Sequence, residues 1–496
     1  MPLDSQSHKS HRRNPTRRDA LKTGSLGVLG LGLSTVRIPA DQSAPPKLYL
    51  EAYTDRSSYE AGDDVSVHVS TNAARYAVEI ARLGAGREVV WSREDLPGAE
   101  QPVPDDASAH GCKWPIAFTV KVSPRWKTGY YAAQVRLAGK DGKYQPGRAR
   151  ELTDSGVPEL FFVIRPAHPG RDARILLQVS TNTYNAYTNY GGYSVYGYQG
   201  RDKVQGRRVS LERPQVTQFW NWEQPFVRWA EKAGYALDYA VNNDLEFRPE
   251  LLKPYRLVLS VGHDEYWSSP MRDHLEAFIA GGGNVAFFSG NVCCWQIRNE
   301  EGGRAFTCWK QDFGDDPYYR DRSHHRLLST LWSHHLVGRP ENQLTGVGFL
   351  WGGYHHSHGQ FMDGPQGFTV ERSDHWLLDG TGLKPGDSFG HKDRIVGYEC
   401  DGCECERKNS LPQPTCRDGT PENFAILATA PARWHPNDCE WYERWEKGRT
   451  GQAVLGTYTR GGTVVTVGTT DWSHGLAGGD RYVEQITRNV LDRLAR

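Results

Sequence analysis

Three ionisable side chains follow a run of apolar, β-branched residues in the middle of the chain. Residues 257–261 predict a buried strand, and after one glycine come His263, Asp264 and Glu265. A serine pair then leads into a helical pattern over 271–280, so the segment predicts a strand, a tight turn and a helix. Catalytic groups of open α/β sheets lie outside the carboxyl ends of the strands. We interpret Glu265 as a metal ligand or general base beside His263, with a helix-capping acid and a solvated histidine as the structural alternative.

A cysteine nucleophile is a further alternative for this sheet edge. Hydrolases with a nucleophile elbow carry Ser or Cys at a strand-to-helix turn. No Ser or Cys occupies the tip of the turn after 257–261, but Cys293 and Cys294 follow the next predicted strand, residues 284–288. The sequence leaves a thiol nucleophile open there.

A tyrosine-rich loop is the second candidate for chemistry. Six tyrosines fall within residues 182–198, directly after an apolar strand predicted over 175–179. This topology brings the loop to the same sheet edge as Glu265. Phenolates are hard, anionic ligands that suit iron(III), and two of them with one carboxylate would balance a trivalent ion. An aromatic stacking surface, as in carbohydrate binding, explains the same tyrosines equally well.

The elements that must position these residues alternate between strand and helix. The pattern indicates right-handed crossovers and a mainly parallel sheet covered on both faces. Strands are expected at 175–179, 237–241, 257–261, 284–288, 453–458 and 463–467, and helices at 222–234, 271–280 and 482–494. The long irregular region from about 295 to 440 is interpreted as functional loops or as insertions held by cross-links of their own.

The region before this α/β pattern is expected to be all-β. Short stretches of alternating apolar and polar residues, separated by Gly and Asp turns, run from residue 47 to about 165. We predict an immunoglobulin-like β-sandwich over 41–166, a hinge at 166–170, and an α/β domain over 171–496.

The first 40 residues have the features of an export signal. Arg17 and Arg18 precede a weakly apolar run, and Ala40 offers a cleavage site. The arginine pair resembles a twin-arginine signal, so we expect a signal peptide over 1–40 and a periplasmic or secreted protein. A basic disordered tail is the alternative. No later segment reaches about 18 apolar residues, so no membrane segment is expected after cleavage.

The amino-acid composition limits the kinds of binding partner that we expect. The chain has 496 residues, of which 24% are charged, and its formal net charge is zero. A balanced charge argues against a nucleic-acid partner. A small-molecule partner is expected, and a homo-oligomer is left open.

The nine cysteines of the chain are candidates for disulfides or a metal site. Cys400, Cys403 and Cys405 lie close together, and Cys416 and Cys439 follow. Disulfides are the expectation for an exported chain, with zinc or free thiols as alternatives, and an odd count leaves one thiol unpaired or intermolecular.

The histidine pairs at 324–325, 334–335 and 355–356 are interpreted as structural or surface residues, because neighbouring side chains on a strand point to opposite faces. His474 follows the 463–467 strand and is a weaker candidate for lining a pocket.

Five motifs carry a family resemblance. They are 182–187 (Asn-Thr-Tyr-Asn-Ala-Tyr), 192–196 (Gly-Tyr-Ser-Val-Tyr), 262–268 (Gly-His-Asp-Glu-Tyr-Trp-Ser), 397–403 (Gly-Tyr-Glu-Cys-Asp-Gly-Cys) and 469–476 (Thr-Thr-Asp-Trp-Ser-His-Gly-Leu). From residue 175 to the end, about two thirds of its length, the chain resembles the large (β) subunit of N,N-dimethylformamidase and the family of its C-terminal domain. The resemblance implies a fold similar to class I glutamine amidotransferase (flavodoxin-like) domains, without their cysteine nucleophile.

The resemblance also implies a site. The family's active site has a mononuclear iron held by two tyrosines and one glutamate. By motif, the glutamate is Glu265, one tyrosine is Tyr187 with Tyr184 as the alternative, and the other is Tyr196. A catalytic histidine and a second glutamate match His263 and Glu399, which would take up a proton and return it to the leaving amine.

The expected function is therefore an exported, iron-dependent hydrolase of an amide or related C–N bond. Two differences from the formamidase leave the substrate open. The formamidase works with a small partner subunit that this chain does not supply, and the family pattern is that of intracellular enzymes, whereas an export signal is expected here. A non-catalytic secreted protein that binds carbohydrate or peptide is the alternative. A lyase or oxidoreductase on the same scaffold also stays open.

Overall fold

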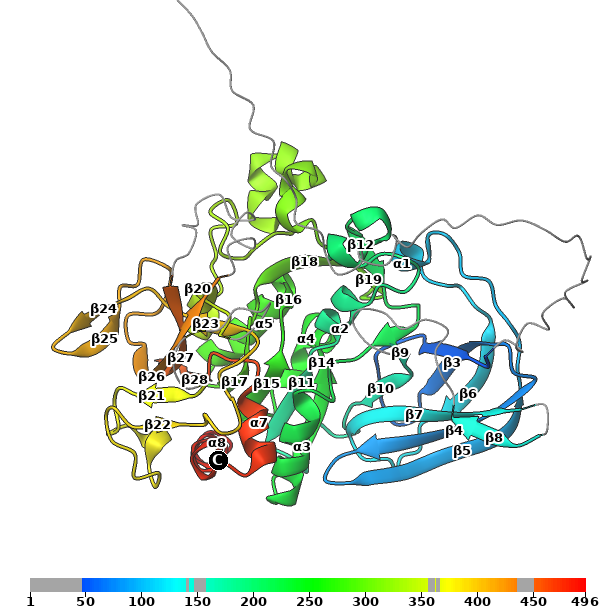
Figure 1. Cartoon of the computed structure of the whole chain (residues 1–496), viewed down its shortest axis with the longest axis horizontal. Helices are drawn as coiled ribbons and strands as arrows, with labels where there is room; N and C mark the ends of the chain where they lie inside the picture. The colour runs from blue at the N-terminus through cyan, green and yellow to red at the C-terminus, as the bar shows by residue number, and fades with distance from the viewer. Residues whose placement is uncertain (1–46, 140–141, 147–157, 356–361, 363–365, 435–449) are drawn as a thin grey trace, which may run out of the picture. The chain divides into compact units, whose positions relative to one another are not determined.

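A computed structural model describes residues 47–139, 142–146, 158–355, 362, 366–434 and 450–496 (Figure 1). Within it, Leu48–Arg496 form one compact unit. The predicted signal peptide and Cys439 lie outside the described residues.

The N-terminal part is mainly β, as predicted, with two sheets that share a core and one short helix, α1 (Ala107–His110). Inward side chains such as Val65 and Val67 of one sheet and Val78 and Ile80 of the other belong to one buried cluster. The smaller sheet has the order β1 (Leu50–Thr54), β3 (Asp64–Thr71), β6 (Ile116–Lys121); the larger has β2 (Ser58–Tyr59), β10 (Phe161–Ile164), β7 (Gly129–Ala138), β4 (Arg75–Leu83), β5 (Arg87–Pro97), with β8 (Tyr144–Pro146) beside β7.

A nine-stranded mixed sheet forms the centre of the rest of the chain. Its first five strands are parallel and its last four are antiparallel, so the predicted parallel sheet makes up one half of it. The order is β14 (Leu237–Val241), β11 (Ile175–Val179), β15 (Leu257–His263), β17 (Asn284–Gly290), β28 (Gly462–Thr466), β27 (Thr450–Arg460), β26 (Ala425–Arg433), β21 (Phe368–Val370), β22 (Ser388–Phe389).

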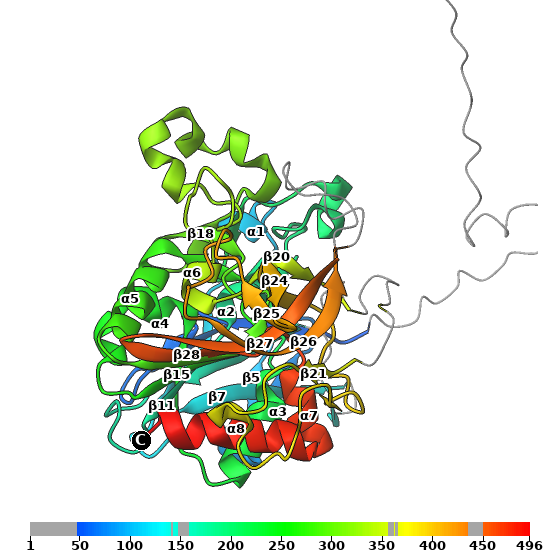
Figure 2. The ribbon, with the colours of Figure 1, turned by 90° about the vertical axis from the view of Figure 1, so that its left-hand side faces the viewer.

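The prediction that the parallel pattern continues to the C-terminus is wrong for one strand pair. β27 and β28 form an antiparallel hairpin, seen as the long orange-red strands of Figure 2. Only Gly461 separates them, with φ of +84°, whereas a parallel pair needs a crossover of a dozen or more residues.

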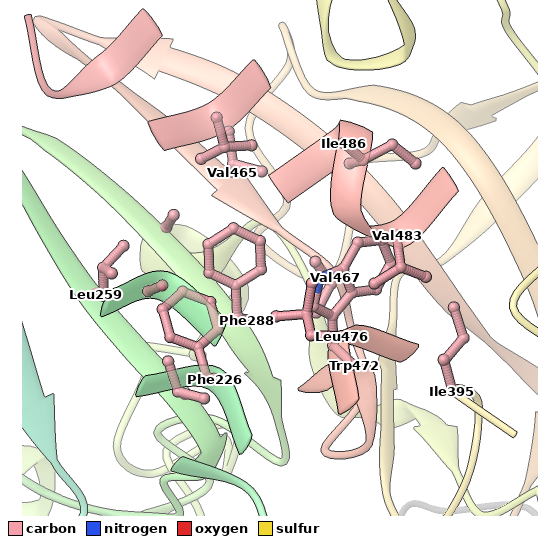
Figure 3. Close-up of a cluster of buried hydrophobic side chains, with 14 of the residues drawn as sticks. Phe226, Leu259, Phe288, Ile395, Val465, Val467, Trp472, Leu476, Val483 and Ile486 are labelled. Carbon is pink, nitrogen blue, oxygen red and sulfur yellow. The ribbon is translucent and has the colours of Figure 1, made fainter. Parts of the chain in front are cut away.

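Helices cover both faces of the parallel half. Alternate residues of β15 pack on opposite sides: Leu259 lies in a cluster with Phe226 and Trp472, and Val258 in another with Met271. Figure 3 shows the first cluster, which joins helices and strands far apart in the sequence. One face carries α3 (Glu223–Lys232), α7 (Trp472–Gly478) and α8 (Arg481–Leu494); the other carries α4 (Asn242–Phe247) and α5 (Ser269–Ala280).

The segment that follows β15 differs from the prediction. β15 continues to His263, and a short strand, β16 (Tyr266–Ser268), comes before α5. Ser268 caps α5, because its Oγ accepts a hydrogen bond from the Met271 N–H. Glu265 therefore lies between two strands, and the helix-capping alternative is wrong. The tyrosine-rich segment also starts as a helix, α2 (Thr181–Tyr187), rather than as a loop.

Smaller elements complete the described residues. A four-stranded sheet has the order β12 (Arg208–Ser210), β19 (Ala305–Thr307), β18 (Trp295–Glu300), β16. Two-stranded pairs are β9 (Pro158–Glu159) with β13 (Gln215–Val216), β20 (Gly348–Gly353) with β23 (Cys400–Gly402), and β24 (Cys405–Lys408) with β25 (Leu411–Pro414). Short helices are α1 (Ala107–His110), α6 (Asn342–Thr345) and the 3-10 turns η2 (Gly197–Gln199), η3 (Arg201–Lys203), η4 (Pro249–Leu252), η5 (Lys310–Asp315), η6 (Pro317–Arg320), η7 (Arg322–Leu327) and η8 (Trp376–Leu378). No helix in the described part of the chain is long and apolar enough to cross a membrane.

Candidate active site

The candidate site lies where the chain order of the parallel strands reverses. β11 sits between β14 and β15, so the chain moves to one side of β11 first and to the other side afterwards. Such a switch point leaves a crevice outside the carboxyl ends of the strands. Tyr187 ends the helix that follows β11, and His263 ends β15. The topology thus explains how residues from separate motifs reach one place.

Glu265 is held rigidly in this crevice. Its carboxylate accepts hydrogen bonds from the Tyr196 hydroxyl at 2.8 and 3.0 Å and from the Trp295 indole N–H at 2.8 Å. Its backbone N–H donates to the Thr183 hydroxyl at 2.9 Å. The residue is 3% exposed. Fixed donors around a buried carboxylate favour its ionised form.

His263 lies between two carboxylates. Its Nε2 is 2.6 Å from Oε2 of Glu399 and 3.3 Å from Oε2 of Glu265. At these distances a protonated His263 forms an ion pair with either carboxylate, and the contact with Glu399 is the closer one. On the other side of the ring, Nδ1 lies 3.2 Å from the amide oxygen of Gln218.

The pKa values of these three side chains differ from their ordinary values. Burial by itself lowers the pKa of His263, but Glu399 and Glu265 more than offset it and raise the value to about 10. Burial raises the pKa of Glu399 despite the imidazolium beside it. Burial also acts to raise the pKa of Glu265, but His263 and Lys310 outweigh it and lower the value. The pKa values of the two glutamates beside this histidine are thus shifted in opposite directions.

Tyr187 completes the group of predicted residues. Its ring centroid lies 4.4 Å from that of Tyr196 and 5.5 Å from that of His263, and its side chain hydrogen-bonds Tyr398. Tyr184 points elsewhere, because its hydroxyl donates to Glu223 of α3. The structure therefore brings together Tyr187, Tyr196, Glu265, His263 and Glu399, and leaves Tyr184 out.

Sequence reasoning missed a buried lysine above Tyr196. Nζ of Lys310 lies 3.3 Å from the centroid of the Tyr196 ring, 4.5 Å from that of Trp295 and 5.4 Å from that of Tyr266. The Tyr266 hydroxyl also donates to that of Tyr196, at 2.8 Å. Lys310 is 3% exposed and adopts a φ of +51°, which is uncommon for a residue with a side chain. No sequence signal points to Lys310, because it lies in the irregular region.

A second missed group forms a wall beside His263. Trp222 and Tyr398 lie 5.6 and 5.9 Å from its ring, and Asp471 holds both. Asp471 accepts from the Trp222 indole at 2.8 Å and from the Tyr398 backbone N–H at 3.0 Å. Gly262, with φ of +81°, is required beneath this wall, because a Cβ there would clash with Trp222. By contrast, Nε2 of His474 lies 3.2 Å from the Asn221 carbonyl, so Asp471 is the residue of its motif that reaches the site.

The other cysteine and histidine candidates stay outside the site. Cys293 is buried, and burial raises the pKa of its thiol, which disfavours a thiolate nucleophile. All eight cysteines of the described residues are free thiols, so the disulfide prediction finds no support among them. Of the paired histidines, His325 and His355 bond backbone carbonyls and His324 is exposed.

Comparison with known proteins assigns the family. Residues 77–486 match the family described as "N,N-dimethylformamidase beta subunit-like, C-terminal", so the chain belongs to this dimethylformamidase-like hydrolase family. The match starts inside β4, further towards the N-terminus than the motifs indicated. The chain is 24% identical to the N,N-dimethylformamidase β subunits of Paracoccus aminophilus, over 461 residues, and of an Alcaligenes species, over 460.

Each of these alignments covers 78% of this chain and 55% of the relative, so the chain spans about half the length of the curated relatives it matches. Among solved structures, a thua-like protein from Parabacteroides merdae is 11% identical over 54% of this chain and 84% of that one. Its TM-score of 0.22 is too low to carry an argument.

Proposed function

We propose that this protein is a metal-dependent hydrolase that acts on an amide or related C–N bond, with a mononuclear iron(III) held by Tyr187, Tyr196 and Glu265. One observation carries the proposal: a tyrosine-bound glutamate and a histidine–glutamate pair meet in one buried group at the switch point of the sheet. The activity named for the two relatives supports this reaction class.

The donor set fits a hard trivalent ion. Burial, reinforced by the charge of Glu265, raises the pKa of the Tyr187 and Tyr196 hydroxyls, so a strong cation is needed to make them phenolates. Within the described ranges, no three His, Cys, Asp or Glu side chains are arranged to hold a metal ion, so binding depends on the tyrosines. When bound, the iron would supply a Lewis acid for a carbonyl oxygen.

The side chains around this donor set provide proton transfer. Glu399, with its raised pKa and its 2.6 Å contact to His263, is suited to accept a proton from water and return it to the leaving amine. His263 stabilises the ionised form of Glu399 before the proton is accepted and after it is returned. Trp222 and Tyr398 form an aromatic wall that would orient a planar amide and exclude bulk water.

Finer features of the fold and setting belong to the same proposal. The parallel order β14-β11-β15-β17-β28 supports a flavodoxin-like, class I glutamine amidotransferase-like core, and the paired N-terminal sheets support an immunoglobulin-like sandwich. We further propose twin-arginine export to the periplasm or beyond. The relatives are named as β subunits, which supports assembly with another chain.

Iron content and the visible spectrum of the purified protein test the metal site. Tyrosinate-to-iron charge transfer should colour the wild type, and Tyr187→Phe and Tyr196→Phe should each weaken the band. Tyr184→Phe is a matched control from the same helix and should keep it, because Tyr184 bonds Glu223 instead. A wild type that stays colourless and iron-free after reconstitution would overturn the proposal. A coloured protein would then be screened on small amides, dimethylformamide included.

A further inference from the structure

Arg213 is a buried arginine whose hydrogen bonds converge on the segment between the two proposed tyrosine ligands. It is 0% exposed and lies just after β12. Its Nε donates to the Ser210 carbonyl at 2.9 Å; one terminal nitrogen donates to the carbonyls of Tyr190 at 2.6 Å and Tyr193 at 3.0 Å; the other donates to the Thr188 carbonyl at 2.8 Å and to the backbone and side-chain oxygens of Asn185 at 3.4 and 3.3 Å.

These contacts explain how an irregular segment can be partly buried. The chain between Tyr187 and Tyr196 has no sheet partner for its carbonyls, and an unpaired buried carbonyl is costly. The guanidinium of Arg213 offers N–H donors in a fixed planar fork, which a lysine cannot reproduce. Every oxygen that it contacts is a carbonyl or an amide, so its charge is solvated by backbone dipoles instead of a carboxylate.

The clamp acts close to both ligands. Asn185 and Thr188 flank Tyr187, and the chain between the ligands is also joined to α2 by a hydrogen bond from the Val195 N–H to the Ala186 carbonyl at 3.3 Å. Val195 and Ala186 are the direct neighbours of Tyr196 and Tyr187. Fixing this segment therefore fixes the spacing of the two hydroxyls.

The sandwich supports the same segment from outside. The Tyr190 hydroxyl donates to Glu51 of β1 at 2.7 Å, and its ring lies edge-on to Trp114 at 6.2 Å. Gly191, with φ of +85°, passes so close to the backbone of Ser108 that a Cβ would collide with it. Arg213 thus holds the inner side of a segment whose outer side rests on the all-β region.

We propose that Arg213 is a positioning residue that sets the separation of Tyr187 and Tyr196 before any metal binds. The candidate site is then preorganised, and metal binding does not have to order the segment. The inference rests on the proposed function for the assignment of these tyrosines as iron ligands, whereas the ordering of the segment by Arg213 does not depend on the metal.

Hydrogen exchange of the wild-type full chain gives the first test, because it needs no substitution. Amides of residues 185–196 should exchange as slowly in the iron-free protein as in the iron-loaded protein. Rapid exchange that becomes slow only after iron is added would overturn preorganisation.

Substitution gives the second test. Arg213→Lys keeps the charge but loses the fork, so exchange at 185–196 should become faster and iron affinity should fall about tenfold to a hundredfold. The charge-transfer band should also shift. Guanidinium ion added to Arg213→Ala should restore part of the affinity.

Arg272→Lys is the matched control, since Arg272 is equally buried and also donates to backbone carbonyls, those of Arg339 and Pro340. It should reduce thermal stability without changing the band. Unchanged exchange, affinity and band in Arg213→Lys would overturn the proposal. If the wild type binds no iron, the proposed function fails, but the exchange difference between wild type and Arg213→Lys still decides the role of Arg213. If Arg213→Lys fails to fold, the wild-type exchange comparison still tests the preorganisation that the proposal requires.

Discussion

The ammonium of Lys310 lies 3.3 Å from the centroid of the Tyr196 ring. Lys310 is buried and Tyr196 is partly buried, and the hydroxyl of the same tyrosine bonds the carboxylate of Glu265. A cation over a tyrosine ring attracts its π electrons, and more strongly once water is excluded. The same charge helps to lower the pKa of Glu265, after the larger effect of His263. Lys310 is therefore placed to favour negative charge on both Tyr196 and Glu265.

Replacing Lys310 by methionine should weaken metal binding. Methionine keeps most of the volume and removes the charge, and a desolvated cation–π contact contributes about 2 kcal/mol, or roughly thirtyfold in affinity. Iron titration followed at the charge-transfer band measures the change. Lys310→Arg is the control that keeps the charge and should lie between wild type and Lys310→Met. Equal iron affinity in all three proteins would mean that Lys310 only fills space.

Glu399→Gln should slow the chemical step and leave the metal site intact. A positioned general acid–base group typically contributes about 10²–10⁴-fold in rate, so kcat should fall within that range, while iron content stays that of the wild type. Steady-state kinetics on the best amide found in the screen, with iron analysis of the same samples, gives both values. A variant that loses iron together with activity would instead make Glu399 part of the metal site.

Asp471→Asn should loosen the aromatic wall. Asp471 holds the indole of Trp222 and the backbone of Tyr398, and displacement of such groups by about 1 Å can cost about a hundredfold in rate. We expect kcat/KM to fall about tenfold to a hundredfold with unchanged iron content. His474→Ala is the neighbouring control and should behave as the wild type. If His474→Ala has the larger effect, the wall is assigned to the wrong residue.

Glu341 should make the protein less stable as the pH rises. Glu341 is 1% exposed, and burial raises its pKa from 4.5 to about 8. Between these two values the unfolded chain has lost the proton that the folded chain keeps, so the free energy of unfolding falls by up to about 1.4 kcal/mol per pH unit. Glu341→Gln removes this dependence.

Denaturant unfolding of both proteins from about pH 5 to about pH 8 measures the effect. The stability of Glu341→Gln relative to wild type should increase steadily across this range. A constant difference would show that Glu341 ionises normally in the folded state.

Arg17→Lys with Arg18→Lys should block export. A twin-arginine signal is read through its arginine pair, so the full-length precursor should accumulate inside the cell. Fractionation and immunoblotting of a bacterial host that expresses the full chain measure this. Arg12→Lys with Arg13→Lys changes an adjacent arginine pair and should leave export normal. Equal export of both double variants would exclude the twin-arginine route.

Local patterns predicted much of the parallel half of the sheet. The predicted strands 175–179 and 237–241 agree in bounds with β11 and β14, because short apolar runs between breakers have few other ways to be buried. The hairpin of β27 and β28 was not foreseen, since periodicity identifies strands but does not determine their direction. The three-residue strand β16 before α5 was also missed, because it is defined by a non-local pairing with β18.

The candidate site divides in a similar way. The motif resemblance pointed to Glu265, His263, Glu399, Tyr187 and Tyr196, and these residues do meet in the structure. Lys310 and Asp471 could not be predicted, because their roles depend on which distant side chains pack against them. Local sequence contains no information about such contacts.

The sequence by itself determined the buried strands and the family. It also determined the two groups of candidate residues that follow the strands at 175–179 and 257–261. Only the tertiary structure decided that Tyr187 rather than Tyr184 joins Tyr196. The two residues lie three positions apart on α2, so they differ by about 60° in direction and about one turn in height. Helix periodicity allows either to face the crevice, and the choice follows from the packing of α2, where Glu223 of α3 takes the Tyr184 hydroxyl.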